Sequence, residues 1–315
     1  MRFAITKCHG SGNDFPMIDA RGSALGDGDW ATVARALAAR DGPVGGDGLL
    51  LLVDGRGDRP FGMRMFNSDG SEAETCLNGL RCVARAGFAA CEVEVADVSL
   101  AQSDAWVERD DDVAPGVYTV AETVGPVGLD VRDWPMRIEA EQVVDAVVPP
   151  LGDRRFTAVA MPNPHLVSFV EEVDEAELSR IGRLCEAAPD WLPRRANVSF
   201  VVQGEDTLFV RTFERGVGLT DSCGSAMAAS VYAACLTGRL GFDRRVTVLN
   251  RGGMVRGVAD AEGSVTISGN ATWEWEGEVE VDLSSGGASD LVVTRRHDDE
   301  AAAWATVVAH ARTYR

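Results

Sequence analysis

The stretch VRTFERGVGLTDSCGSAM, residues 210–227, decides the fold. It opens with the apolar alternation of a strand, passes through the charged pair Glu214 and Arg215 into a glycine-rich turn, and ends just after Cys223. The Ala-rich run at 226–236 predicts a helix. The thiol therefore lies at a helix start, where the dipole and unpaired backbone N–H groups are expected to lower its pKa and attract anions.

An earlier stretch, MRMFNSDGSEAETCLNGLRCVARAGF at residues 63–88, has the same layout. A strand at 61–67 leads into a polar turn at 68–75, Cys76 follows, and a helix is predicted at 77–89. The repeated order of strand, turn, cysteine and helix predicts two duplicated α+β domains that face each other.

Two thiols at matching positions suggest an acid–base pair. One thiolate could remove a proton from one face of a carbon while the other thiol protonates the opposite face, which inverts a stereocentre. Such chemistry needs no metal or cofactor if helix N-termini stabilise the developing negative charge. A lone cysteine is more often a buried structural residue, and this is the interpretation for Cys8, Cys82, Cys91, Cys185 and Cys235.

Composition limits the partners. The chain has 30 Lys plus Arg against 49 Asp plus Glu, which disfavours nucleic acid and an anionic membrane surface. No apolar run approaches the roughly 18 residues of a membrane span, and the N-terminus lacks the apolar core of a signal peptide. Seven cysteines without a CxxC pair favour a reducing cytoplasm, and metal-ligand spacing is absent.

Further elements follow from periodicity and turn residues. Additional helices are predicted at 30–40, 174–188 and 300–314, with Asp174 as an N-cap. The acidic segment 101–116 is expected to be a loop or the tip of a hairpin, residues 137–148 a strand, and the Ser/Gly-rich segment 284–290 a linker to the terminal helix.

Five segments together resemble the diaminopimelate epimerase family. They occur in the family's order between residue 1 and about residue 282, and they are KCHGSGNDF (7–15), FNSDGSEAETCLNG (66–79), MPNPH (161–165), ANVSF (196–200) and VRTFERGVGLTDSCGSAM (210–227). The resemblance implies two pseudo-symmetric α+β domains, each with mixed or antiparallel strands around a central helix, and an active site in the cleft between them. It also implies a cofactor-independent isomerase that converts LL- to meso-diaminopimelate, in lysine and cell-wall precursor synthesis.

The resemblance also assigns site residues. Cys76 and Cys223 would be the catalytic pair, and His165 and Glu214 would flank the stereocentre. A neutral imidazole and a carboxylate suit an ammonium group. The substrate-binding residues would be amides, an Arg and the starts of the two helices: Asn13, Asn67, Asn78, Gly79, Asn163, Asn197, Arg215, Gly224 and Ser225. Taken singly, each Asn is more often a turn residue, and His165 a strand-turn histidine bonded to backbone.

Departures from the family pattern leave the substrate open. Leu77 stands directly after the first thiol where the family has Gly, and Leu219 stands where it has Glu. A bulky side chain next to a close backbone approach would change the pocket. One alternative is therefore a racemase of another amino acid, such as histidine, on the same fold. Another is a non-catalytic paralogue that binds amino acids, against which the retained thiols and Glu214 argue.

The expected organisation is an N-terminal domain of residues 1–130 plus 273–283, a C-terminal domain of residues 131–272, and an extra tail, 284–315, with a helix. The expected partners are an amino-acid substrate and a second copy of the chain, forming a homodimer. Neither nucleic acid nor a membrane is expected as a partner, and the expected location is the cytoplasm.

Overall fold

The computed structural model describes residues 1–73, 76–134, 136–161 and 163–314, and it divides the chain into two compact units. Unit 1 comprises Met1–Glu122 and Ser268–Val307, and unit 2 comprises Thr123–Ile267 and Val308–Arg315. The predicted turn 68–75 and the predicted turn at 162–164 each include positions outside the described residues, namely Glu74, Thr75 and Pro162. The expected domain bounds stay a prediction.

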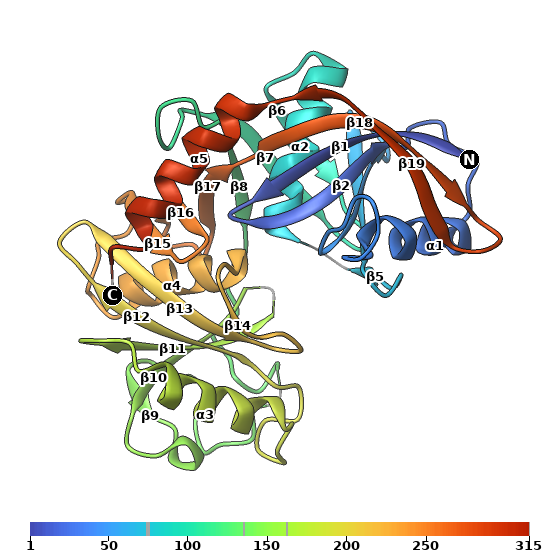
Figure 1. The fold of residues 1–315 in the computed structure, drawn as a ribbon. Coiled ribbons are helices and arrows are strands. Elements are labelled where there is room, and N and C mark those ends of the chain that lie inside the picture. Colours follow the sequence, from blue (N-terminus) through green and yellow to red (C-terminus); the bar gives the residue numbers. More distant parts are fainter. Residues whose placement is uncertain (74–75, 135, 162, 315) are drawn as a thin grey trace. The chain divides into compact units, whose positions relative to one another are not determined.

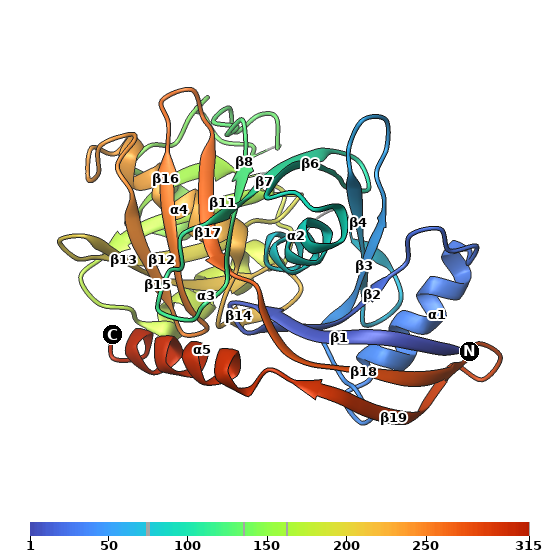
Figure 2. The same ribbon diagram turned by 90° about the horizontal axis from the view of Figure 1, so that it is seen from above.

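Unit 1 surrounds helix α2 with strands (Figure 2). Its elements are β1 (Arg2–Gly10), β2 (Asn13–Asp19), α1 (Asp27–Ala38), β3 (Gly48–Asp54), β4 (Phe61–Asn67), β5 (Glu72–Ala73), α2 (Leu77–Cys91), β6 (Val95–Ser99), β7 (Asp104–Asp110), β8 (Thr119–Val124), β17 (Val265–Asn270), β18 (Thr272–Asp282), β19 (Gly287–Arg296) and α5 (Asp298–Ala311). Three of these elements, β8, β17 and α5, also include residues of unit 2.

Unit 2 carries helices on both sides of its central strands, with α3 on one side of β12 and β13 and α4 on the other (Figure 1). Its remaining elements are β9 (Ala146–Val147), the 3₁₀ turn η1 (Pro149–Leu151), β10 (Arg155–Ala160), β11 (Pro164–Val170), α3 (Glu175–Glu186), β12 (Asn197–Gln203), β13 (Thr207–Glu214), β14 (Gly218–Thr220), α4 (Gly224–Leu236), β15 (Val246–Asn250) and β16 (Gly253–Ala259).

The two units repeat one pairing pattern, as the sequence predicted. In unit 1, β1 and β2 are antiparallel, β2 and β3 parallel, β3 and β4 antiparallel, β4 and β5 antiparallel, and β4 and β6 parallel. In unit 2, β10 to β15 pair in the same sequence of senses. In each unit a cysteine is the N-cap of the helix after the short fifth strand, Cys76 for α2 and Cys223 for α4.

Burial explains why these segments form these elements. In the run 48–54, Leu50 and Leu52 pack in the core under α2, while Leu49 and Leu51 pack in the core under α1. Successive side chains of a strand point to opposite faces, so a strand covered on both faces is continuously apolar. The apolar residues around the whole circumference of α4 likewise match its nearly complete burial.

Two predicted elements are wrong and a third is right only in part. In the segment 101–116, residues 101–103 form the tip of the β6–β7 hairpin, but Asp104–Asp110 form β7, which pairs with β6 from Val95↔Glu108 to Ser99↔Asp104. The expected strand 137–148 is mostly irregular, and only Ala146–Val147 pair as β9. The expected linker 284–290 is a hairpin turn and the start of β19, which pairs with β18.

The terminal helix predicted at 300–314 is present as α5. Helices α1, α2 and α3 also lie where they were expected, and Asp174 caps α3 by accepting from the backbone N–H groups of Ala176 and Glu177. In the part of the chain that the structure describes, no helix is both long enough and apolar enough to cross a membrane.

Candidate active site

In unit 1, the chain brings candidate residues to one end of the sheet. Asn13 begins β2, and Asn67 ends β4 opposite Gly48, the first residue of β3. Because β2 and β3 run parallel and β4 runs antiparallel to β3, these strand ends meet at the same edge. Cys76 at the start of α2 contacts this edge through Asn13.

Cys76 has two close polar neighbours. Its half-buried sulfur accepts from the backbone N–H of Gly79 at 3.4 Å and donates to the side-chain oxygen of Asn13 at 3.7 Å. A Cβ on Gly79 would lie 2.7 Å from the Leu50 side chain and 3.5 Å from the Cys76 sulfur. Glycine is therefore needed where α2 approaches both the core and the thiol.

The side chains of Asn67 and Asn78 are engaged elsewhere. Asn67 donates to the Ser71 hydroxyl at 3.0 Å, within its own turn. Asn78 is 5% exposed, and its amide oxygen accepts from Arg81 at 2.8 Å. The structure thus groups Asn13 and Gly79 with Cys76, and it directs the side chain of Asn78 into the interior instead.

Unit 2 repeats this arrangement at the edge formed by β11, β12 and β13. His165 on β11 pairs with Asn197, the first residue of the parallel strand β12, and Glu214 ends β13. The His165 Nε2 lies 2.9 Å from the Asn163 side-chain oxygen. The side-chain oxygen of Asn197 accepts from the backbone N–H of Arg215 at 2.9 Å.

Three side-chain atoms at this edge are buried without a hydrogen-bond partner in the described part of the chain. They are His165 Nδ1, Asn197 Nδ2 and Arg215 Nε. Buried polar atoms are normally bonded, so each unpartnered one needs an explanation. If the Asn163 oxygen accepts from Nε2, Nδ1 keeps its lone pair, and the three atoms offer one acceptor and two donors. A zwitterionic amino acid would satisfy such a set.

Cys223 is 7% exposed and is the N-cap of α4. Its sulfur lies 3.5 Å from the Ser225 hydroxyl, and Gly224 is the first residue of the helix. Burial, followed by the charge of Glu214, raises the pKa of the Cys223 thiol to about 12, although Ser225 and the Ala226 backbone N–H act in the opposite direction. The expected lowering by the helix start is therefore wrong for Cys223, because desolvation outweighs it.

The neighbours of Cys223 are shifted as well. Burial lowers the pKa of His165 to about 3, assisted by Arg215, so the imidazole is neutral. Burial raises the pKa of Glu214, against the hydrogen bond from Cys223 and the charge of Arg215. Burial also lowers the pKa of Arg215. Burial thus raises the proton affinity of both the carboxylate and the thiol.

Asn67 and Glu214 hold equivalent places. Each is the last residue of the strand that precedes the short fifth strand, and each is nine residues before its N-cap cysteine, from 67 to 76 and from 214 to 223. In unit 2 this place is held by a carboxylate, which is a neighbour of Cys223, whereas in unit 1 it is held by the neutral amide of Asn67. The repeat is therefore chemically asymmetric, as two distinct roles require.

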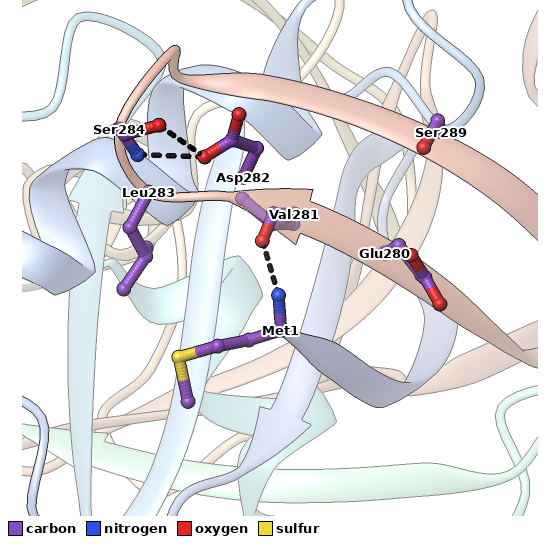
Figure 3. Close-up of a pocket in the computed structure, with 7 residues that line it drawn as sticks. All are labelled: Met1, Glu280, Val281, Asp282, Leu283, Ser284 and Ser289. Atoms are coloured by element: carbon purple, nitrogen blue, oxygen red, sulfur yellow. Dashed lines mark hydrogen bonds between the residues drawn. The ribbon is translucent and has the colours of Figure 1, made fainter.

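A hollow of about 430 Å³ lies at the N-terminus (Figure 3). The amino group of Met1 donates to the Val281 carbonyl at 2.6 Å, and Asp282 accepts from the backbone and hydroxyl of Ser284. Its other lining residues are Glu280, Leu283 and Ser289. Four of the lining residues, Met1, Val281, Asp282 and Ser284, are bonded in these two pairs, and neither Cys76 nor Cys223 is among the lining residues.

Sequence reasoning missed two charged residues that support the unit 1 site. Asp47 bonds Asn13, and Arg81 bonds Asn78. Asp47 lies in the glycine-rich loop 41–48. Arg81 is a charged residue on the buried face of a helix, and the other residues of that face are largely apolar. This contrast is the feature of the sequence that could have identified Arg81.

Solved structures share this fold. A phenazine biosynthesis protein of the PhzF family from Bacillus anthracis matches with a TM-score of 0.64 and 13% identity, over 89% of this chain and 100% of that one. A hydroxyproline epimerase from Agrobacterium vitis matches with a TM-score of 0.60 and 15% identity, over 91% and 94%. The chain shares the fold of these proteins.

Sequence comparison identifies the family. The family model for diaminopimelate epimerase matches residues 5–108 and 157–274. The diaminopimelate epimerase of Clostridium acetobutylicum is 40% identical over 291 residues, 88% of this chain and 86% of the relative. That of Enterococcus faecalis is 36% identical over 315 residues, 95% and 96%. The chain belongs to the diaminopimelate epimerase family.

The tail is not peculiar to this chain. The match to the Enterococcus faecalis relative leaves only 5% of the chain outside it, so it must extend past residue 283. The expectation of a tail extra to the family is therefore wrong for this relative. The hairpin of β18 and β19 shows how the first part of the tail is built into unit 1.

Proposed function

We propose that this chain interconverts LL- and meso-diaminopimelate, with Cys76 and Cys223 as the two groups that exchange protons with the α-carbon. It is an isomerase of amino-acid and lysine biosynthesis, as its family membership and the names of its relatives indicate. The observation that carries the two-thiol mechanism is the matched placement of Cys76 and Cys223 as helix N-caps in two units of like topology.

Glu214 supplies the means of making a thiolate. It is the hydrogen-bonding neighbour of Cys223, and burial raises its pKa above the ordinary value of a carboxyl group, so it accepts a proton more readily than an exposed carboxylate would. A proton passed from Cys223 to Glu214 would leave a sulfur able to take the α-proton, and Cys76, which donates to Asn13, would deliver a proton to the other face. Reversal of these roles gives the opposite direction of epimerisation.

The remaining candidates would hold the substrate. Neutral His165 offers a lone pair to an ammonium group, and Asn197 and Arg215 offer buried donors to a carboxylate. The helix N-termini at Gly79 and at Gly224 with Ser225 suit the carboxylate on the reacting α-carbon. The negative charge of this carboxylate grows as the carbanion forms. The side chains of Asn13, Asn67 and Asn163 complete the proposed set, to which Asn78 contributes its backbone N–H at the start of α2.

Exchange of the α-proton in D₂O tests the proposal. With diaminopimelate and no added cofactor, deuterium should enter the α-carbon as the isomers interconvert. Cys76→Ser and Cys223→Ser should each reduce epimerisation by about 100-fold or more, the scale of a lost acid–base group. Cys82→Ser and Cys235→Ser are matched controls because they change buried cysteines on the same two helices, and they should retain most activity.

The outcome also decides between alternatives. Exchange with histidine or another amino acid but not with diaminopimelate would point to a racemase with a different substrate. Binding without exchange would point to a non-catalytic paralogue. The relatives named above favour diaminopimelate, and Leu77 is 6% exposed, so its side chain is buried rather than spread over open surface.

Assembly and location are further proposals. We expect a homodimer, which sedimentation equilibrium would test by a mass of twice the 33.6 kDa chain. We expect the protein to act in the cytoplasm, where thiols stay reduced. We also expect no cofactor or metal, so that dialysis against a chelator should leave the activity unchanged.

A further inference from the structure

The loop that precedes β3 is fixed against β2. The backbone N–H of Asp47 donates to the carbonyl of Asp14 at 2.8 Å. A Cβ on Gly46 would lie 2.7 Å from the Pro16 ring, so the loop can approach this closely only with glycine there. The Asp47 side chain is therefore held beside the start of β2, where Asn13 lies.

The Asp47 carboxylate determines which way the Asn13 amide points. One of its oxygens accepts from the side-chain nitrogen of Asn13 and from the backbone N–H of Asp14, the latter at 3.1 Å. Its other oxygen accepts from Arg40 at 2.5 Å. An ionised carboxylate accepts but cannot donate, so the amide nitrogen must face it. The amide oxygen of Asn13 then faces the other way, toward the Cys76 sulfur 3.7 Å away.

This orientation distinguishes the two protonation states of Cys76. An amide oxygen can accept from the S–H group but has no hydrogen to offer a thiolate. The reversed amide would present N–H to the sulfur and favour the thiolate. We propose that Asp47 is a positioning residue that fixes the Asn13 amide so that Cys76 rests as a thiol, ready to donate a proton. This inference rests on the proposed catalytic role of Cys76.

Other charges surround Asp47 and bear on the test. Lys7 on β1 pairs with Asp14 at 2.5 Å, and Arg40 after α1 pairs with both Asp14 and Asp47. A simple loss of negative charge at Asp47 would also favour a thiolate, as any nearby charge change does. The experiment must therefore separate the direction of the amide from the net charge of the cluster.

Alkylation of Cys76 by iodoacetamide, followed by peptide mass mapping over a range of pH, reports its thiolate fraction without turnover. In Asp47→Asn the midpoint should move to lower pH by about half a unit to one unit, which gives about three- to tenfold faster alkylation below the midpoint. Asp41→Asn removes the same charge from the same loop and should move it much less. Arg40→Gln leaves the carboxylate facing Asn13, so its midpoint should stay the same or rise.

Two results would overturn the proposal. One is an unchanged alkylation profile in an Asp47→Asn protein whose thermal unfolding matches that of the parent. The other is an equal shift in Asp41→Asn, which would assign the effect to charge alone. If Asp47→Asn does not fold, Asp47→Glu provides the second test, since it keeps an acceptor-only group and should keep the parental profile. A chain without epimerase activity would refute the proposed function and still leave this measurement readable.

Discussion

At the scale of the residue, burial rather than position on a helix governs the reactive groups of unit 2. Cys223 stands at the N-terminus of α4, yet burial and Glu214 raise its pKa. The same burial keeps His165 neutral and raises the pKa of Glu214. A thiol with a high pKa stays protonated at rest and gives up its proton reluctantly, so Cys223 needs Glu214 to become a thiolate.

Glu214→Gln should separate these effects. Removing the carboxylate removes a negative neighbour, so the pKa of Cys223 should fall, while turnover should drop by about 100-fold or more because the proton acceptor is lost. The pKa can be followed by the ultraviolet absorbance of the thiolate, as the difference from the same protein with Cys223→Ser. Glu214→Asp keeps the charge and should recover part of the rate. Parental turnover in Glu214→Gln would exclude Glu214 as the acceptor.

The residue types of the site could be predicted from the sequence, but their states could not. The helix start at Cys223 was visible as a turn followed by Ala-rich sequence. Its desolvation depends on the strands and helix packed around it, which no local pattern reports. Asn78 shows the same limit, because its place beside Cys76 suggested a substrate contact, whereas its side chain binds the buried Arg81.

At the scale of the element, α2 is anchored by one buried guanidinium. Arg81 is fully buried and donates to Glu122 at 2.7 Å, to Asn78 at 2.8 Å and to the Ser11 hydroxyl and the Asn270 carbonyl, both at 3.2 Å. These bonds tie the first turn of α2 to the β1–β2 turn and to β8 and β17. The orientation of the Cys76 end of α2 thus depends on a residue outside the site.

Arg81→Met should lower the free energy of unfolding by about 3–5 kcal/mol, the cost of leaving one member of a buried ion pair alone. Burial raises the pKa of Glu122 to about 7 while Arg81 opposes the rise, so Glu122 should take up a proton when Arg81 is removed. Urea unfolding measures the loss. The double change Arg81→Met with Glu122→Leu should recover part of it. A loss below about 1 kcal/mol in the single variant would contradict the anchoring role.

Prediction of the elements failed where local pattern and pairing disagree. The segment 137–148 alternates like a strand, but Val143 and Val148 lie on irregular backbone and are buried there. Its apolar residues therefore reflect burial and not the pairing of a β-strand. Conversely, the charged run in 104–110 is a strand because β6 pairs with it. Ser284 marked a linker by composition, but it bonds Asp282 and turns the β18–β19 hairpin.

At the scale of the whole molecule, each unit buries a histidine that acid should titrate. Burial lowers the pKa of His9 in unit 1 to about 4 and that of His165 in unit 2 to about 3. A group whose pKa is lower in the folded state stabilises the fold above its ordinary pKa of 6.5, and this stability is lost as the pH falls. Glu122 has a raised pKa and acts in the opposite direction between about 7 and 4.5.

Replacing each histidine separates its effect on stability from the opposing effect of Glu122. From pH 6 to pH 4.5, the parent should lose up to about 1.4 kcal/mol of unfolding free energy per pH unit relative to His165→Gln, and likewise relative to His9→Gln. Urea titrations over this range measure the difference. If the two units unfold separately, His9→Gln should alter only the transition of unit 1 and His165→Gln only that of unit 2. Parallel pH curves for parent and variant would mean that the histidine is protonated in the fold, and a protonated His165 could not accept from the substrate ammonium group.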